Sequence, residues 1–369
     1  MVMVARRSVL AGMAALPALP GFARSRAPSP VERLYRDAIV INGNLVAPFD
    51  DAKPLSADDA RQVRESGITA FKMTLGGSTS SRAETVEQIA WLDAAIAANR
   101  DLFVKIRAAG DIAAAKRAGR TGIIYSFEGA SMLDGAVDAI AAFRAAGVLV
   151  MGLSYNLATP FASGVLAKES TGLTALGREA VEQMNARGVA IDLSHSDEPS
   201  SMAAIAASRR PVLITHAGCA AVHPHPRNKS DALIRALAGR GGVIGIYELS
   251  FIADGPRQQS LDDYIAHLTH AIAVAGEDHV GIGSDALMGR FDTSPQNMAM
   301  WNEDIARRKA AGVSAPGEGP PPFVEGLNRS DRMAVIAGAL AARGVRGAAI
   351  DKILGRNFQR VFAEAWAAA

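Results

Sequence analysis

Residues 189–216 carry the stretch that decides the fold, VAIDLSHSDEPSSMAAIAASRRPVLITH. It holds two short apolar runs separated by an alanine-rich segment, and the runs end in His195 and His216. Short runs rich in Val and Ile are typical of strands buried on both faces, and a helix-length segment between two of them is typical of a parallel sheet. The stretch therefore predicts a strand–helix–strand unit whose two strands both end in histidine.

The same alternation recurs along the chain and predicts eight strands. The expected strands are apolar runs that precede longer Ala-rich stretches: Ala38–Asn44, Thr69–Leu75, Gly122–Glu128, Val148–Asn156, Val189–His195, Pro211–His216, Gly242–Glu248 and His279–Asp285. Eight such units predict an α/β fold, a single (β/α)8 TIM barrel, which routinely uses a chain of 369 residues as one domain. The alternative is a doubly wound open sheet, in which only the strand ends near the switch point would meet.

Helix boundaries can be read for two of the intervening segments. Gly177–Arg187 follows a threonine suited to capping and is followed by Gly188, a good helix stop. Leu261–Ala275 is a second expected helix and carries His267 and His270. We expect these two histidines to lie on a helix face and not to bind a metal.

Most of the predicted strands end in a side chain capable of chemistry. These strand-end residues are Asn44, Glu128, Tyr155, Asn156, His195, His216, Glu248 and Asp285. In a parallel barrel the C-terminal strand ends converge on one face, where active sites are built. The pattern therefore favours the barrel and predicts a functional site on that face.

Four of these side chains suggest a metal site. A lone strand-end histidine is more often a satisfied core residue, but His195 and His216 end successive strands, whose ends lie only about 5 Å apart. With Glu128 and Asp285 they offer nitrogen and oxygen ligands suited to zinc or a similar divalent ion. The alternative is a structural polar network. A metal held this way would lower the pKa of bound water, and Asp285 is the residue expected to pass a proton to a leaving amine.

A basic loop follows the sixth predicted strand. Its sequence, His223–Asn228, contains two prolines that stiffen it and one arginine, Arg227. An arginine fork can bind a substrate carboxylate through two hydrogen bonds, which would make Arg227 a substrate-binding residue. The alternative is a surface arginine in a rigid turn.

Composition limits the classes of function. Hydrophobic residues make up 49% of the chain and charged residues 21%, which allows a large core and argues against disorder. The net charge is +2 and no basic run is present, so a nucleic-acid partner is not expected. The single cysteine, Cys219, excludes an intrachain disulfide.

The first 27 residues are expected to be a twin-arginine export signal, and residues 28–369 the barrel domain. Arg6 and Arg7 precede a weakly apolar stretch, Val9–Phe22, which is too short for an integral membrane span. Such signals are addresses read by a receptor, so the protein is expected to be periplasmic or secreted. The alternative is an ordinary N-terminus with a chance arginine pair.

From about Asp37 to Phe362 the chain resembles the renal, or membrane, dipeptidases, a branch of the amidohydrolase superfamily. The segments that carry the resemblance are Ser126–Ala130, Gly172–Arg178, Ile191–His195, Thr215–His216, His225–Asn228, Gly281–Asp285 and Ile353–Phe362. The resemblance implies that Glu128, His195 and His216 bind zinc. It also implies that Arg227 holds the carboxylate of a dipeptide.

The departures from the family pattern concern the chemistry. The family's first strand ends in Asp-Gly-His-Asn-Asp, whose His and last Asp bind one of two zinc ions, and here Asn44 and Val46 stand in those places. Tyr155 stands where the family has a histidine that steadies the oxyanion, and its hydroxyl can still donate a hydrogen bond. The family's second Asp after Asp285 is also lost.

Two hypotheses follow. The first is a metal-dependent hydrolase of dipeptides or related small amides, with one tightly bound zinc or similar ion on Glu128, His195 and His216, and with Tyr155 and Asp285 in catalysis. Three protein ligands plus water is the usual catalytic zinc arrangement. The second is a barrel that binds a small carboxylated ligand without turnover. The oligomeric state stays open, a homo-oligomer included.

Overall fold

The computed structural model describes residues 27–255 and 257–367. Its main sheet consists of parallel strands, which are β1 (Ile41–Asn42), β3 (Ala70–Thr74), β4 (Phe103–Lys105), β5 (Thr121–Phe127), β6 (Val148–Gly152), β7 (Ala190–Asp192), β8 (Leu213–Ala217), β9 (Val243–Ile246) and β10 (Val280–Ile282). Pairing runs β3-β1-β10-β9-β8-β7-β6-β5, and β3 also pairs with β5. Eight strands therefore close into a barrel, and each overlaps one of the eight predicted runs. The predicted TIM barrel is confirmed.

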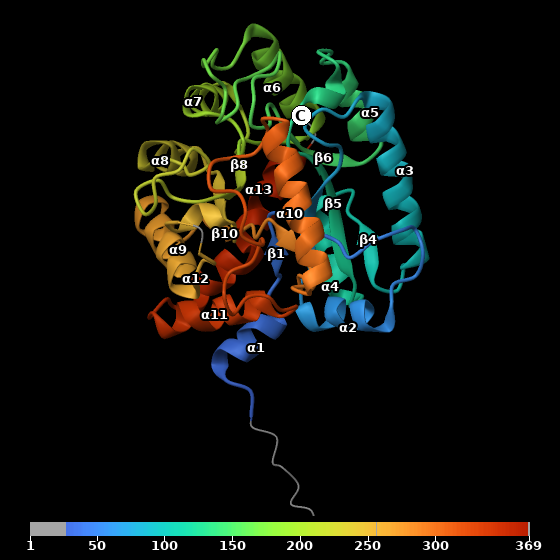
Figure 1. The fold of residues 1–369 in the computed structure, drawn as a ribbon, viewed down its shortest axis with the longest axis vertical. Coiled ribbons are helices and arrows are strands. Elements are labelled where there is room, and N and C mark those ends of the chain that lie inside the picture. The colour runs from blue at the N-terminus through green and yellow to red at the C-terminus, as the bar shows by residue number, and fades with distance from the viewer. Residues whose placement is uncertain (1–26, 256, 368–369) are drawn as a thin grey trace, which may run out of the picture.

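The helices surround this barrel (Figure 1). They are α1 (Pro30–Asp37), α2 (Ala57–Ser66), α3 (Arg82–Ala98), α4 (Ala109–Arg117), α5 (Ala139–Ala145), α6 (Ala175–Arg187), α7 (Glu198–Ala207), α8 (Asp231–Gly239), α9 (Leu261–Ala275), α10 (Pro295–Ala310), α11 (Arg332–Ala342), α12 (Gly347–Asp351) and α13 (Asn357–Trp366). Helix α6 begins at the Thr174 cap and ends at Gly188, which adopts the left-handed conformation. Helix α9 has the predicted bounds. No helix among the described residues is long and apolar enough to cross a membrane.

Three short strands were not predicted. Strand β4 pairs with Thr121–Ile123, the first part of β5, and β6 takes over the same edge from Tyr125 onward. The other two, β2 (Leu45–Val46) and β11 (Ala286–Leu287), form a separate two-stranded ladder. These runs are too short to show a period in the sequence.

Most of the predicted strands were too long at their C-terminal ends; the run ending at His216 is the exception, because β8 continues to Ala217. The run ending at His195 pairs only over β7, and His195 follows three residues later. In this position the chain leaves the sheet, and its polar side chains point to the barrel mouth instead of into the ladder. The strand ends therefore build the site.

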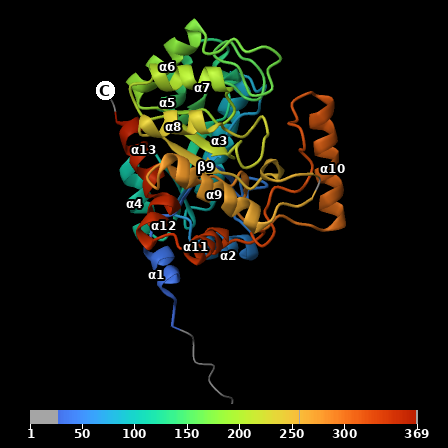
Figure 2. The same cartoon turned by 90° about the vertical axis from the view of Figure 1, so that its left-hand side faces the viewer.

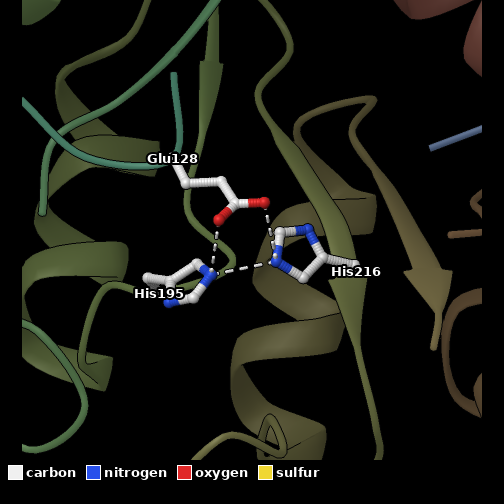
Figure 3. A group of neighbouring side chains, drawn as sticks. All are labelled: Glu128, His195 and His216. Atoms are coloured by element: carbon white, nitrogen blue, oxygen red, sulfur yellow. Dashed lines mark hydrogen bonds and ion pairs between the residues drawn. The ribbon is translucent and has the colours of Figure 1, made fainter. Parts of the chain in front are cut away.

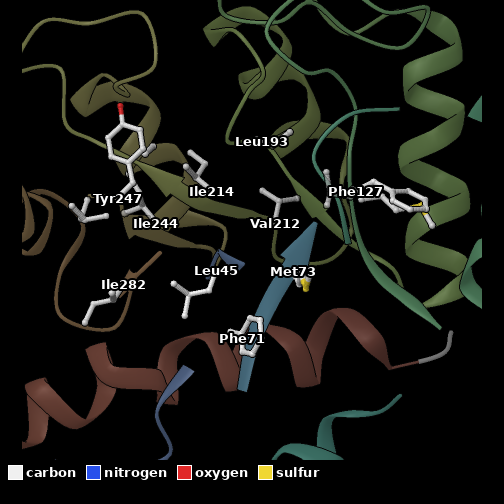
Figure 4. Close-up of a cluster of buried hydrophobic side chains, with 14 of the residues drawn as sticks. Leu45, Phe71, Met73, Phe127, Leu193, Val212, Ile214, Ile244, Tyr247 and Ile282 are labelled. Carbon is white, nitrogen blue, oxygen red and sulfur yellow. The ribbon is translucent and has the colours of Figure 1, made fainter. Parts of the chain in front are cut away.

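The core consists of apolar side chains from the strands and the helices that cover them. Phe71, Phe127, Ile214 and Ile244 are among the buried residues shown in Figure 4. Helix α13 adds Phe358, whose ring lies so close to the backbone of β10 that a side chain at Gly281 would clash with it. Burial of each such side chain is worth roughly 1.5–3 kcal/mol. The packed interior gives the strand ends a rigid base.

Helix α10 is an addition to the barrel. Figure 2 shows it set apart from the other helices and joined to them by extended segments. We call residues 295–326, which comprise α10 and the segment after it, the cap.

Candidate metal centre

Glu128, His195 and His216 come together at the C-terminal ends of three barrel strands (Figure 3). Glu128 directly follows β5, and His216 lies within β8. The Nε2 atoms of the two histidines are 3.0 Å apart, and the Glu128 carboxylate oxygens lie 3.6 Å from His195 Nε2 and 3.7 Å from His216 Nε2. The structure thus groups the three residues that the sequence singled out as metal ligands.

The proton of the His216 ring can be assigned from its neighbours. Thr215 Oγ1 lies 2.5 Å from Asp192 Oδ2 and donates its only proton to that carboxylate. His216 Nδ1 lies 2.9 Å from the same hydroxyl, which can therefore only accept from it. Nδ1 carries the ring proton, and Nε2 presents a lone pair toward Glu128.

His195 has two polar partners at its outer nitrogen, Asn156 and Arg227. The Asn156 side chain donates from Nδ2 to the Val313 carbonyl at 3.1 Å, which turns its oxygen toward His195 Nδ1 at 2.9 Å. The Arg227 guanidinium, which can only donate, contacts the same nitrogen. The other ring nitrogen, His195 Nε2, faces His216 Nε2 and Glu128. Partners of this kind on the outer nitrogen are typical of metal-binding histidines.

The two Nε2 atoms, 3.0 Å apart, form one compact donor group with the Glu128 carboxylate. Burial lowers the pKa of both rings well below 6.5, and nearby positive charges add to this effect, chiefly Arg227 at His195 and Lys72 at His216. Both rings are therefore neutral, the form that binds metals. The donor set of two imidazoles and one carboxylate fits zinc or a similar divalent ion.

Asp285 lies beside this group and is linked to it through Asn44. The Asn44 side-chain nitrogen donates to Glu128 Oε1 at 2.8 Å and to Asp285 Oδ1 at 2.7 Å. Asp285 has a φ of 54°, a left-handed conformation that costs roughly 1–2 kcal/mol outside glycine. Burial and the Glu128 charge raise the pKa of Asp285 to about 7. One amide thus holds two carboxylates together.

Lys72 is a part of the site that sequence reasoning missed. Its side chain is fully buried in β3, and its Nζ lies 3.5 Å from Asp192 Oδ2 and 3.9 Å from Glu128 Oε1. A lysine in the middle of an apolar strand, AFKMT, was the available signal, because buried lysines require nearby acidic partners. Lys72 adds a fixed positive charge beneath Glu128.

Arg227 is buried and lines a cavity of about 240 Å³ above the metal ligands. Only 2% of the residue is exposed, so the interpretation as a surface arginine is wrong. Its Nη1 contacts His195 Nδ1 and lies 3.4 Å from Asn156 Oδ1. Its Nε and Nη2 atoms are buried without a hydrogen-bond partner among the described residues. An unpaired guanidinium edge of this kind is suited to an anionic group in the cavity.

Tyr155 lies in the same cavity, stacked on His195 with ring centroids 4.2 Å apart. Burial and the nearby Glu128 raise the pKa of its hydroxyl, which therefore keeps its proton at neutral pH. The predicted substrate-contacting tyrosine is thus placed beside the metal ligands with a proton to donate.

Other polar residues from the sequence do not join the site. Glu248 is buried against Arg332 at 3.4 Å, away from the metal ligands. His267 accepts a hydrogen bond from the Cys219 amide, and His270 pairs with Asp231, as expected for structural histidines. Val46 lies in β2 and is 47% exposed. The second metal position of the family pattern therefore lacks this ligand.

Comparisons with known proteins find similar chains and folds. A family model described as membrane dipeptidase (peptidase family M19) matches residues 59–304. An uncharacterized protein in the pqqA 5' region of Klebsiella pneumoniae is 31% identical over 290 residues, which are 76% of this chain and 95% of that protein.

Two solved structures share the fold. An amidohydrolase from Pseudomonas aeruginosa has a TM-score of 0.80 and 27% identity, covering 91% of this chain and 99% of that one. A metallo peptidase from Rhodobacter sphaeroides, liganded with a phosphinate mimic of the dipeptide L-Ala-D-Ala, has a TM-score of 0.71 and 19% identity, covering 89% and 100%.

Proposed function

The chain belongs to the membrane dipeptidase family, peptidase family M19, and is a dipeptidase-like hydrolase; from this premise we propose that it cleaves dipeptides or related small carboxylated amides with one divalent ion. The observation that carries the proposal is the grouping of two histidine Nε2 atoms with the Glu128 carboxylate beneath the unpaired edge of Arg227. A binding protein for small carboxylated ligands would need Arg227 but would have no use for the three metal-ligand atoms.

In this proposal Glu128, His195 and His216 hold the ion, zinc or a similar metal. When bound, it polarises the scissile carbonyl and lowers the pKa of water at that position. Asp285 exchanges the proton, because a pKa of about 7 lets a carboxyl group both take and release one near neutral pH. Tyr155 donates its hydroxyl proton to the oxygen that develops negative charge.

Arg227 binds the substrate carboxylate. Its free Nε and Nη2 atoms form one edge of the guanidinium, which matches the two oxygens of a carboxylate. The Nη1 atom donates a hydrogen bond to Asn156 Oδ1, which keeps the arginine in place. The substrate is thereby anchored beside the metal ligands.

We propose that a single ion is bound tightly, where the family pattern has two. Asn44 donates a hydrogen bond to each of Glu128 and Asp285, so both carboxylates already have a donor where a second ion would need them. Lys72 supplies positive charge 3.9 Å from the same Glu128 oxygen. Asn44 and Lys72 therefore stabilise the negative charge that a second cation would otherwise neutralise.

Elemental analysis after dialysis, with a dipeptide hydrolysis screen, tests this proposal. We expect one ion per chain, and the double variant Asn44→His/Val46→Asp should move the stoichiometry toward two. Two tightly held ions in the unmodified protein would contradict the single-ion proposal. No metal and no hydrolysis of any dipeptide would favour the binding protein.

We also propose that the protein is exported by the twin-arginine route to the periplasm or the cell exterior. Arg6, Arg7 and the apolar stretch after them support this proposal. These residues lie outside the described part of the structure.

A further inference from the structure

The cap supplies a large part of the wall above the metal ligands. Trp301, Asp304, Arg308 and Glu318 line the same cavity as Tyr155 and Arg227. The family model ends at residue 304, so Arg308 and Glu318 lie beyond the matched segment. The match to the family therefore assigns no role to Arg308 or Glu318.

Arg308 and Tyr155 stand between two cavities. Both line the cavity of about 240 Å³ that holds Arg227 and Asp285. Both also line a second cavity of about 180 Å³, which lies against Glu128 and the backbone of Gly129. Arg308 therefore reaches from the cap to the position where Tyr155 faces the metal ligands.

The two side chains are neighbours, and each is held from its other side. The Arg308 guanidinium lies beside the Tyr155 hydroxyl in the walls of both cavities, and its positive charge acts on that hydroxyl. Glu318 pairs with Arg308 through Nε and, at 3.4 Å, through Nη2, and it also accepts the Ala315 amide at 2.9 Å. Tyr155 is stacked on His195. The pair is thus fixed at both ends.

The chemistry of arginine decides which way the hydroxyl proton points. A guanidinium is positively charged and presents only N–H groups, so the neighbouring Tyr155 hydroxyl turns its oxygen lone pairs toward it. The phenolic proton then points away from Arg308 and is free for a partner in the cavity. The positive charge also acts against the rise in the Tyr155 pKa and makes the hydroxyl a stronger donor.

We propose that Arg308 is a positioning residue that aims the Tyr155 proton at the oxygen which becomes negative during amide hydrolysis. This inference rests on the proposed function, because it needs Tyr155 to act as the oxyanion donor. The proposal makes the cap part of the catalytic machinery. An enzyme without Arg308 would keep its metal and the carboxylate-binding Arg227, but its Tyr155 hydroxyl would no longer be aligned.

A double-mutant cycle tests the proposal with Arg308→Met and Tyr155→Phe. Loss of an oxyanion donor costs about 10²–10³ in kcat, and misalignment of a retained donor should cost less, about tenfold to hundredfold. We expect Arg308→Met to lower kcat by that amount with KM and metal content little changed, and Arg308→Lys to restore part of it. In the Tyr155→Phe background Arg308→Met should have almost no further effect, because the proton that it aims is gone.

Arg307→Met is the matched control. Arg307 precedes Arg308 on α10, but its side chain is 76% exposed and pairs with Asp304 on the helix surface. We expect this variant to keep the kcat of the unmodified enzyme.

Binding of a phosphinate dipeptide analogue, measured by calorimetry, gives a second readout that does not need turnover. Its anionic tetrahedral group should lose affinity in both single variants, again without additivity. Additive losses, in kcat or in affinity, in a protein that hydrolyses dipeptides would overturn the role of Arg308 alone. An unmodified protein that neither hydrolyses dipeptides nor binds the phosphinate would refute the proposed function, and this inference with it.

Discussion

Replacement of Arg227 by methionine separates substrate anchoring from chemistry. Methionine keeps an unbranched side chain of similar length in a buried position, but it removes the Nε and Nη2 donors, which have no partner among the described residues. A charge-assisted contact of this kind is worth about 1.5–3 kcal/mol. At 1.4 kcal/mol for each factor of ten, the loss in affinity should be about tenfold to hundredfold.

The assay compares a dipeptide with the same dipeptide amidated at its C-terminus. The unmodified enzyme should prefer the free carboxylate, in kcat/KM, by about the factor given above. Arg227→Met should lose this preference and treat both substrates almost alike. Because the arginine also contacts His195, the metal content of the variant must be measured as well, and we expect it to be largely retained.

Arg235→Met is the control, because Arg235 lies on α8 with most of its side chain exposed. It should keep the preference for the carboxylate. If Arg227→Met discriminates between acid and amide as well as the unmodified enzyme does, then the unpaired guanidinium edge does not face the substrate carboxylate. In that case Arg227 is not a substrate-binding residue.

Three further predictions concern the metal, pH and export. His195→Ala should abolish metal retention and hydrolysis together; an active variant that holds a full equivalent of metal would exclude His195 as a ligand. Burial lowers the pKa of His267 to about 4, so its neutral form stabilises the fold fully above pH 6.5, and this contribution, roughly 3 kcal/mol, is lost as the pH falls to 4. Urea unfolding should show the advantage of the unmodified protein over His267→Gln shrinking across that range, whereas a constant difference would contradict the buried neutral ring. Replacement of both Arg6 and Arg7 by lysine should block export, and unimpaired export of that variant, followed in cell fractions, would exclude the twin-arginine route.

The fold could be predicted from the sequence because each barrel strand is buried on both faces. Burial of this kind leaves a run of Val, Ile and Leu that is visible without a structure, as in Val212–Ile214 just before His216. The bounds were less accurate, since most of the polar residues that mark a strand end lie past the point at which the backbone leaves the ladder, whereas His216 stays within β8. His195 shows this most clearly, three residues past the end of β7.

The metal ligands were also predictable, since parallel topology alone brings the ends of neighbouring strands together. Lys72 and Arg308 could not be found in the same way. Lys72 sits inside a strand, and its acidic neighbours come from β5 and β7. Arg308 depends on how the cap folds back over the barrel, and no local pattern encodes that path.

Asn44 departs from the family pattern, and the sequence and the structure lead to different interpretations of that departure. From the sequence alone it is a poor substitute for a histidine ligand, which suggests a damaged site. In the structure its amide lies between Glu128 and Asp285 and donates to both, so the two acidic groups stay close without a second cation. Asparagine at position 44 thus removes a metal ligand and at the same time provides an amide that donates to both carboxylates. A site that had simply decayed would leave Asp285 without this donor, whereas here Asn44 supports both carboxylates beside the grouped atoms of Glu128, His195 and His216.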